Sequence, residues 1–168
     1  LLLDCPALFE RPGNPYLDAS GADHPDNALR FGLLSRVAAR LGQRGSPLGW
    51  QPDVVHVNDW QSGLAPAYLH YEGGAPSVIT VHNIAFQGCF GHDMLAALGL
   101  PEQAWRFDGV EYYKQLSFLK AGLQFATRLS TVSPTYASEI QTEHFGYGLA
   151  PLLRYRAAAL RGILNGID

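Results

Sequence analysis

Two runs rich in β-branched residues, separated by one helix-length segment, constrain the fold of this chain most. Residues 53–57 read Asp-Val-Val-His-Val, and residues 77–81 read Ser-Val-Ile-Thr-Val. Short apolar runs of this kind are typical of strands buried in a parallel sheet. Residues 62–71 between them have the length of a helix, provided that Pro66 lies in its first turn, where proline is tolerated. Strand, helix and strand at this spacing predict a parallel sheet.

The remaining segments continue the alternation of helices and strands. Apolar residues four positions apart predict a helix over 29–41, with Asp26 near its start and Gly42 just past its end. A similar spacing predicts a second helix over 111–126, with Tyr112, Leu116, Leu119 and Leu123 on one face.

Short apolar segments predict three further strands, at residues 1–3, 129–132 and 161–164. Ser133 follows the second of these as a helix N-cap, with Pro134 at the first helical position. The fold class is therefore α/β. We expect a Rossmann-like parallel sheet with helices on both faces, joined by right-handed crossovers.

Polar residues follow the predicted strands at the edge of the sheet where ligands bind in such folds. Asp59 comes after strand 53–57, His82 and Asn83 after strand 77–81, and Asn165 after the closing strand. Asparagine, aspartate and histidine supply the donors and acceptors that a sugar, with its many hydroxyls, requires. This edge is the candidate site.

Taken singly, each of these residues also has a structural interpretation. A histidine at a strand end is more often structural than catalytic, and Asp59 could cap the helix that follows it. Asn165 and the glycine after it form a common turn dipeptide. Trp60 could offer an apolar face to a sugar ring or belong to the core. The combination of residues is therefore more informative than any member.

Composition excludes several classes of protein. Apolar residues make up 47% of the 168 positions and the formal net charge is −3, which is typical of a globular domain without the basic face of a nucleic-acid or anionic-lipid binder. No apolar run approaches the roughly 20 residues of a membrane span. Only Cys5 and Cys89 are present, which favours a reducing compartment, and we expect a cytoplasmic protein.

Several segments, in order along almost the whole chain, resemble one enzyme family. Residues 56–66 resemble the His-x-x-Asp-Trp-x-x-Gly-Leu-x-Pro segment of bacterial glycogen synthases and plant starch synthases. Residues 80–88 resemble their Thr-x-His-Asn-x-x-(aromatic)-Gln-Gly segment. Further matching segments are residues 4–16, 117–122, 131–137 and 164–168. The match is best to the bacterial enzymes.

The resemblance implies a retaining glucosyltransferase of the GT-B type, with two Rossmann-like domains facing each other across a cleft. Such enzymes transfer glucose from ADP-glucose, or UDP-glucose in some relatives, to the non-reducing end of an α-1,4-glucan such as glycogen. They need no metal and no cofactor besides the nucleotide-sugar donor. The partners implied are the donor and the glucan, without nucleic acid or membrane.

The family pattern also implies roles for single residues. His82 matches a histidine that contacts the donor glucose with its side chain and directs its backbone carbonyl at the anomeric carbon. Asp59 matches an aspartate near the reacting centre that orients the acceptor or His82. Asn83 and Gln87 would shape the acceptor path, and Asn165 would contact the donor glucose. Phe9 stands where some members have a tyrosine.

Parts of the family pattern are absent from residues 1–168. The Lys-x-Gly-Gly-Leu phosphate loop, the first strand and the C-terminal domain have no counterpart, so we expect part of an N-terminal catalytic domain from a longer protein, inactive alone. Both ends of the sequence read as interrupted strands. Two alternatives remain open: a glucan-binding module without catalysis, and another retaining GT-B enzyme such as a sucrose synthase or mannosyltransferase relative.

Overall fold

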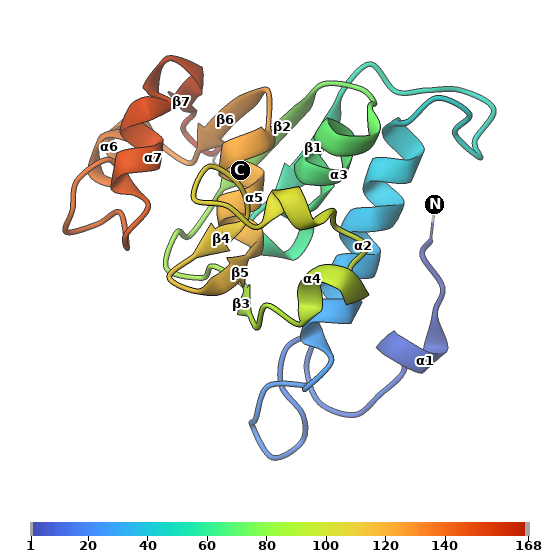
Figure 1. Ribbon diagram of the computed structural model, residues 1–168. Coiled ribbons are helices and arrows are strands. Elements are labelled where there is room, and N and C mark those ends of the chain that lie inside the picture. The colour runs from blue at the N-terminus through green and yellow to red at the C-terminus, as the bar shows by residue number, and fades with distance from the viewer. Residues whose placement is uncertain (1, 167–168) are drawn as a thin grey trace.

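The computed structural model describes residues 2–166 and contains a four-stranded parallel sheet (Figure 1). Its strands lie in the order β1-β2-β6-β7, and every neighbouring pair is parallel. The strands are β1 (Val55–Asn58), β2 (Ser77–Val81), β6 (Arg128–Thr131) and β7 (Leu160–Gly162). The predicted α/β class with a parallel sheet is confirmed. In the described residues, no helix combines the length and the hydrophobicity needed to cross a membrane.

The core lies between this sheet and three helices. The helices are α2 (Asn27–Gly42), α3 (Ala65–Glu72) and α5 (Phe118–Phe125). The strand register aligns Val57, Ile79, Leu129 and Leu160 across the sheet, and all four side chains are buried. Their burial on the helix side supplies the hydrophobic stabilisation of this layer.

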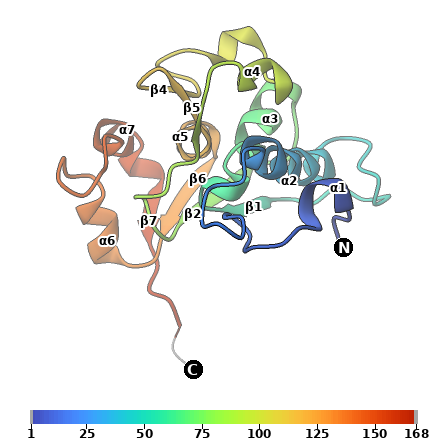
Figure 2. The ribbon, with the colours of Figure 1, turned by 90° about the horizontal axis from the view of Figure 1, so that it is seen from below.

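The helices cover the sheet less evenly than expected. From β1 to β2 to β6 each strand is added on the same side of the one before it, and right-handed crossovers then place the linking helices α3 and α5 on one face. Figure 2 shows α3 and α5 on the same side of the strands. The opposite face presents polar side chains: His56 Nε2 lies 2.7 Å from Thr80 Oγ1, which lies 2.6 Å from Ser130 Oγ.

Two sequence predictions were wrong in detail. Residues 111–117 are not helical: they form a hairpin of β4 (Glu111–Tyr112) and β5 (Gln115–Ser117), and β5 also pairs with β3 (Cys89–Phe90). The two turn residues, Tyr113 and Lys114, have φ angles of 46° and 63°. Such turns usually contain Asn-Gly, so the sequence lacked the expected signal. The predicted opening strand is also absent at residues 2–3, and residue 1 lies outside the described residues.

Helix ends follow the predicted chemistry more closely. Ser133 caps α6 (Pro134–Glu139) by accepting a hydrogen bond from the backbone N–H of Tyr136, and Pro134 lies in the first turn. Pro66 likewise lies in the first turn of α3, which begins at Ala65 because a 3₁₀ turn, η1 (Trp60–Ser62), precedes it. Gly42 is the last residue of α2, so the helix ends one residue later than predicted.

The remaining short elements lie in the connections. They are α1 (Pro6–Phe9), α4 (Met94–Ala97), η2 (Glu102–Ala104), α7 (Ala150–Tyr155) and η3 (Ala157–Ala159). Between β2 and α5 the chain makes a long excursion that carries β3, α4, η2, β4 and β5. Its two ends meet, because Gln87 and Gly88 accept backbone hydrogen bonds from Leu119 and Phe118, at 3.1 and 3.0 Å.

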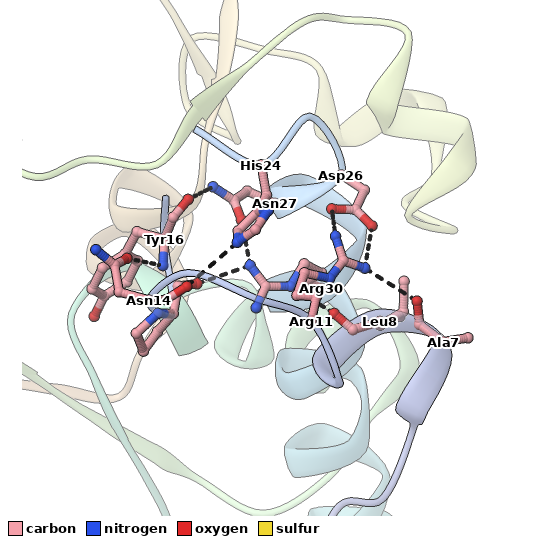
Figure 3. Close-up of polar contacts among 10 residues, drawn as sticks. Ala7, Leu8, Arg11, Asn14, Tyr16, His24, Asp26, Asn27 and Arg30 are labelled. Atoms are coloured by element: carbon pink, nitrogen blue, oxygen red, sulfur yellow. Dashed lines mark hydrogen bonds and ion pairs between the residues drawn. The ribbon is translucent and has the colours of Figure 1, made fainter. Parts of the chain in front are cut away.

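A buried arginine fastens the N-terminal segment to α2 (Figure 3). The Arg30 side chain is 4% exposed and donates to the carbonyls of Leu8 and Pro15 and to Asn27 Oδ1, at 2.7–2.9 Å. Next to it, Asp26 was predicted at the helix start and is the N-cap residue, but its carboxylate makes no capping bond. It accepts two hydrogen bonds from Arg11 instead, at 2.7 and 2.9 Å.

The Arg11–Asp26 pair gives a prediction about acid stability. The Arg11 hydrogen bonds lower the pKa of Asp26 in the folded state. The pair therefore stabilises the fold fully at pH values above the pKa of about 3.9 that Asp26 has in the unfolded chain. This stabilisation is lost as the pH falls through the lower folded pKa. We expect Asp26→Asn to be less stable than the parent chain at pH 7, and the difference to shrink from pH 5 to pH 2. Urea unfolding at each pH measures it, and a constant difference would contradict the prediction.

Candidate functional site at the strand ends

The carboxyl ends of β1 and β2 bring Asp59 and His82 together, as the sequence predicted. The register pairs Asn58 with Thr80, so the residues that follow lie at the same edge of the sheet. His82 Nε2 lies 3.0 Å from Asn58 Oδ1. An amide oxygen can only accept, so Nε2 carries the shared proton and Nδ1 of a neutral imidazole remains an acceptor. Asn58 thereby orients the ring.

The Asp59 carboxylate holds the backbone that follows β2. Its Oδ1 accepts hydrogen bonds from the backbone N–H groups of His82 and Asn83, at 2.7 and 3.3 Å. It makes no capping bond to η1, so the capping interpretation was wrong. Asp59 has φ 50° and ψ −164°, a conformation that favours glycine and costs on the order of 1–3 kcal/mol. Backbone strain of this kind is often found at functional sites.

The loop after His82 is fixed by side chains from distant elements. Asn83 Oδ1 accepts from the Ala85 N–H at 3.0 Å, and the Tyr136 hydroxyl accepts from the Ile84 N–H at 3.1 Å. Gln87 Nε2 donates to the carbonyl of Tyr147 at 2.9 Å. The loop that carries Asn83 and Gln87 therefore has a defined shape.

Trp60 belongs to the core and offers no open face to a ligand. It is 9% exposed, and its ring packs against four others at centroid distances of 4.6–6.2 Å. Gly88 has φ 58°, and a Cβ there would lie 2.3 Å from the Trp60 ring. Glycine at position 88 thus lets the loop pass directly over the indole of Trp60. This close approach fixes the position of the neighbouring Gln87.

A hollow of about 450 Å³ adjoins this loop. Gln87, Tyr112 and Tyr147 line it together with Cys89. Burial raises the pKa of the Cys89 thiol and of the Tyr112 hydroxyl, so both remain protonated at neutral pH. The Tyr112 hydroxyl donates to the Tyr147 carbonyl. The two tyrosines were not predicted as site residues, because they lie 25 and 60 positions from Gln87 in sequence.

Asn165 is the one predicted site residue that the structure does not bring to the others. It is exposed and lies beyond the end of β7, the outer strand farthest from β1 in the sheet. Figure 2 shows this segment leading away from the strands. Its predicted contact with a donor glucose stays a prediction.

Comparisons with known proteins identify the family. A family model described as the starch synthase catalytic domain matches residues 1–155. The glycogen synthase of Dechloromonas aromatica is 82% identical over all 168 residues, and that of Nitrosomonas europaea is 59% identical over 99% of this chain. The chain spans about a third of the length of these relatives, 35% and 34%.

A solved structure agrees with these relatives. It is the catalytic domain of Starch Synthase IV from Arabidopsis thaliana bound to ADP and acarbose. It superposes with a TM-score of 0.78 at 32% identity, over 86% of this chain and 31% of that one. From the family model, the relatives and the shared fold, the chain belongs to the starch synthase catalytic domain family.

Proposed function

We propose that this chain forms one wall of the active-site cleft of a glycogen synthase. The reaction would transfer glucose from ADP-glucose to the non-reducing end of an α-1,4-glucan, with retention of configuration. The chain would be part of the N-terminal domain of that enzyme. The observation that carries the proposal is the pair of hydrogen bonds from the backbone of His82 and Asn83 to Asp59.

These hydrogen bonds fit the chemistry of glucosyl transfer. Departure of the nucleotide leaves positive charge on the sugar ring, and an oriented carbonyl dipole stabilises that charge. Asp59 holds the two peptide groups that flank the His82 Cα. The second of these contains the His82 carbonyl, so Asp59 fixes where that carbonyl points. We therefore assign His82 the contact with donor glucose and Asp59 the role of a positioning residue.

The remaining predicted site residues are assigned roles in binding the acceptor and the donor. Asn83 and Gln87 would line the path of the acceptor glucan, and Asn165 would contact the donor glucose once its segment is held against the site. ADP and acarbose in the Arabidopsis structure support a nucleotide and a saccharide as partners. A cytoplasmic location is supported by Cys5 and Cys89, which are both free thiols.

Activity requires groups that residues 1–168 do not supply, so the chain alone is expected to be inactive. We would compare it with a hybrid synthase, in which this chain replaces the equivalent segment of the Dechloromonas aromatica glycogen synthase. Incubated with labelled ADP-glucose and glycogen, the hybrid synthase should incorporate glucose and the chain alone should not, because leaving-group stabilisation is a large part of catalysis.

Each outcome of this comparison is informative. A folded hybrid synthase that binds glycogen without transferring glucose would favour the glucan-binding module instead. Transfer that requires a different nucleotide sugar or a different acceptor would favour another enzyme of the same architecture. Incorporation by the chain alone would contradict the expectation that catalysis needs both walls of the cleft.

A further inference from the structure

Residues 131–137 approach the loop that carries His82 from the side opposite Asp59. β2 lies between β1 and β6 in the sheet, so the residues after β2 have Asp59 on one side and the end of β6 on the other. Residues 131–137 match the family pattern, although none of them is among the predicted site residues. Two polar side chains of this segment, Thr131 and Tyr136, contact the end of β2 and the loop after it.

Thr131 and Tyr136 hold the peptide groups before and after the one that contains the His82 carbonyl. Thr131 is 1% exposed, and its hydroxyl donates to the Val81 carbonyl at 2.7 Å. The Tyr136 hydroxyl accepts from the Ile84 N–H at 3.1 Å. Both distances are normal for hydrogen bonds of these types. The two flanking peptide groups are therefore tied to the connection between β6 and α6.

The position of the His82 carbonyl depends on these contacts as well as on Asp59. A planar peptide group between fixed neighbours keeps one freedom, which is rotation about the line between its two Cα atoms. Thr131 and Tyr136 hold the neighbours and so fix this line. The hydrogen bond from the Asn83 N–H to Asp59, at 3.3 Å, then sets the rotation. Among the described residues no group donates to the His82 carbonyl, so it stays free to face a ligand.

The start of α6 is a firm support for the Tyr136 side chain. Ser133 Oγ accepts from the Tyr136 N–H at 2.9 Å, and Pro134 restricts the first turn. β7 passes so close that a Cβ at Gly162 would lie 2.2 Å from the Ser133 carbonyl oxygen. The Tyr136 ring is half-buried and packs against the hydrophobic core. The hydroxyl that accepts from the loop is therefore itself held in place.

We propose that Tyr136 is a positioning residue for glucosyl transfer, which acts by aiming the His82 carbonyl, and that Thr131 supports it. The inference deepens the proposed function and rests on it, because the His82 carbonyl has its role only in that reaction. An oriented carbonyl dipole stabilises charge that develops in the transition state. Loss of the Tyr136 hydroxyl should therefore lower kcat and leave the binding of donor and acceptor nearly unchanged.

The test is Tyr136→Phe in the hybrid synthase, because phenylalanine keeps the ring in the core and removes only the hydroxyl. We expect kcat to fall about tenfold, with KM for ADP-glucose and for maltotriose changed by less than about twofold, since small misplacements are costly at a reacting centre. The matched control is Tyr71→Phe, which also removes a hydroxyl from a half-buried tyrosine at the core. In the described part of the chain the Tyr71 hydroxyl makes no hydrogen bond, so the control should keep its kcat.

Further comparisons separate a positioning role from a purely structural one. In an Asp59→Ala background, Tyr136→Phe should lower kcat much less than tenfold, because the carbonyl is already misdirected and the two losses are not additive. Thr131→Ser keeps the donor to the Val81 carbonyl and should retain more activity than Thr131→Val, which removes it. Hydrogen exchange of the Ile84 amide should be faster in the Tyr136→Phe variant.

The outcomes distinguish this inference from the proposed function. If the unchanged hybrid synthase transfers glucose and a folded Tyr136→Phe variant keeps the same kcat, this inference alone is overturned. An equal, tenfold loss with and without Asp59 would mean that Tyr136 acts independently of the His82 carbonyl, which also overturns it. A raised KM with unchanged kcat would do the same, since Tyr136 would then bind substrate. An unchanged hybrid synthase that transfers no glucose overturns the proposed function, and this inference with it.

Discussion

Asp59→Ala in the hybrid synthase is expected to lower kcat about 100-fold, with a much smaller change in KM for glycogen. The substitution removes the carboxylate that accepts from the His82 and Asn83 N–H groups, at 2.7 and 3.3 Å. A misdirected carbonyl dipole loses stabilisation of the transition state rather than of bound substrate. Initial rates with labelled ADP-glucose measure the effect, and circular dichroism checks the fold.

Asp59→Asn is the matched control for this prediction. Asparagine tolerates a positive φ and keeps an oxygen that can accept both N–H groups, while the charge is lost. If Asp59 acts by positioning His82, the asparagine variant should be clearly more active than the alanine variant. Equal losses in the two variants would show that the charge itself is required, and would contradict the positioning role. His82→Ala should lower kcat at least as much as Asp59→Ala.

Gly63→Ala is expected to destabilise the 168-residue chain by about 3 kcal/mol. A Cβ at Gly63 would lie 2.3 Å from the Phe118 carbonyl oxygen, so two backbone segments would have to separate. Gly122 faces the same contact, and a Cβ there would lie 3.1 Å from the Gly63 carbonyl oxygen. Urea unfolding followed by circular dichroism measures the change in the free energy of unfolding.

The control for this prediction is Gly166→Ala, where a Cβ meets nothing within 4 Å and φ is not in the left-handed region. It should change the free energy of unfolding by only a few tenths of a kcal/mol. A similarly small effect at Gly63 would mean that η1 and α5 can move apart, and that their close approach does not stabilise the sheet edge that carries Asp59.

The parallel sheet was predictable because its signal is local. The runs at 53–57 and 77–81 and the prolines and serines at helix starts each reflect the chemistry of neighbouring residues. The β4–β5 hairpin was not predictable, because Leu116, Leu119 and Leu123 satisfy helical spacing from inside the hairpin onward. Only pairing with β3, a segment more than 20 residues away, makes the strand favourable there.

The candidate site likewise contains residues that the sequence predicted and contacts that it could not predict. Asp59, His82 and Asn83 were predicted together because parallel register brings strand ends to one edge, whatever the side-chain details. The family pattern pointed to Gln87 but not to its partner, the Tyr147 carbonyl, which depends on the fold of a distant segment. Backbone carbonyls leave no trace in a sequence motif, so contacts of this kind cannot be found from residue types.

The long excursion between β2 and α5 has a consequence for how such enzymes diversify. Its ends are held together by the Gln87 and Gly88 carbonyls, and insertions between ends that are already joined cost little free energy of loop closure. Its buried residues, among them Leu95, Val110 and Leu116, belong to the core, so changes in length are expected only at its exposed turns, such as Tyr113 and Lys114. Variation in length among relatives is then expected to concentrate at these exposed turns, where it leaves the strand ends and the core unchanged.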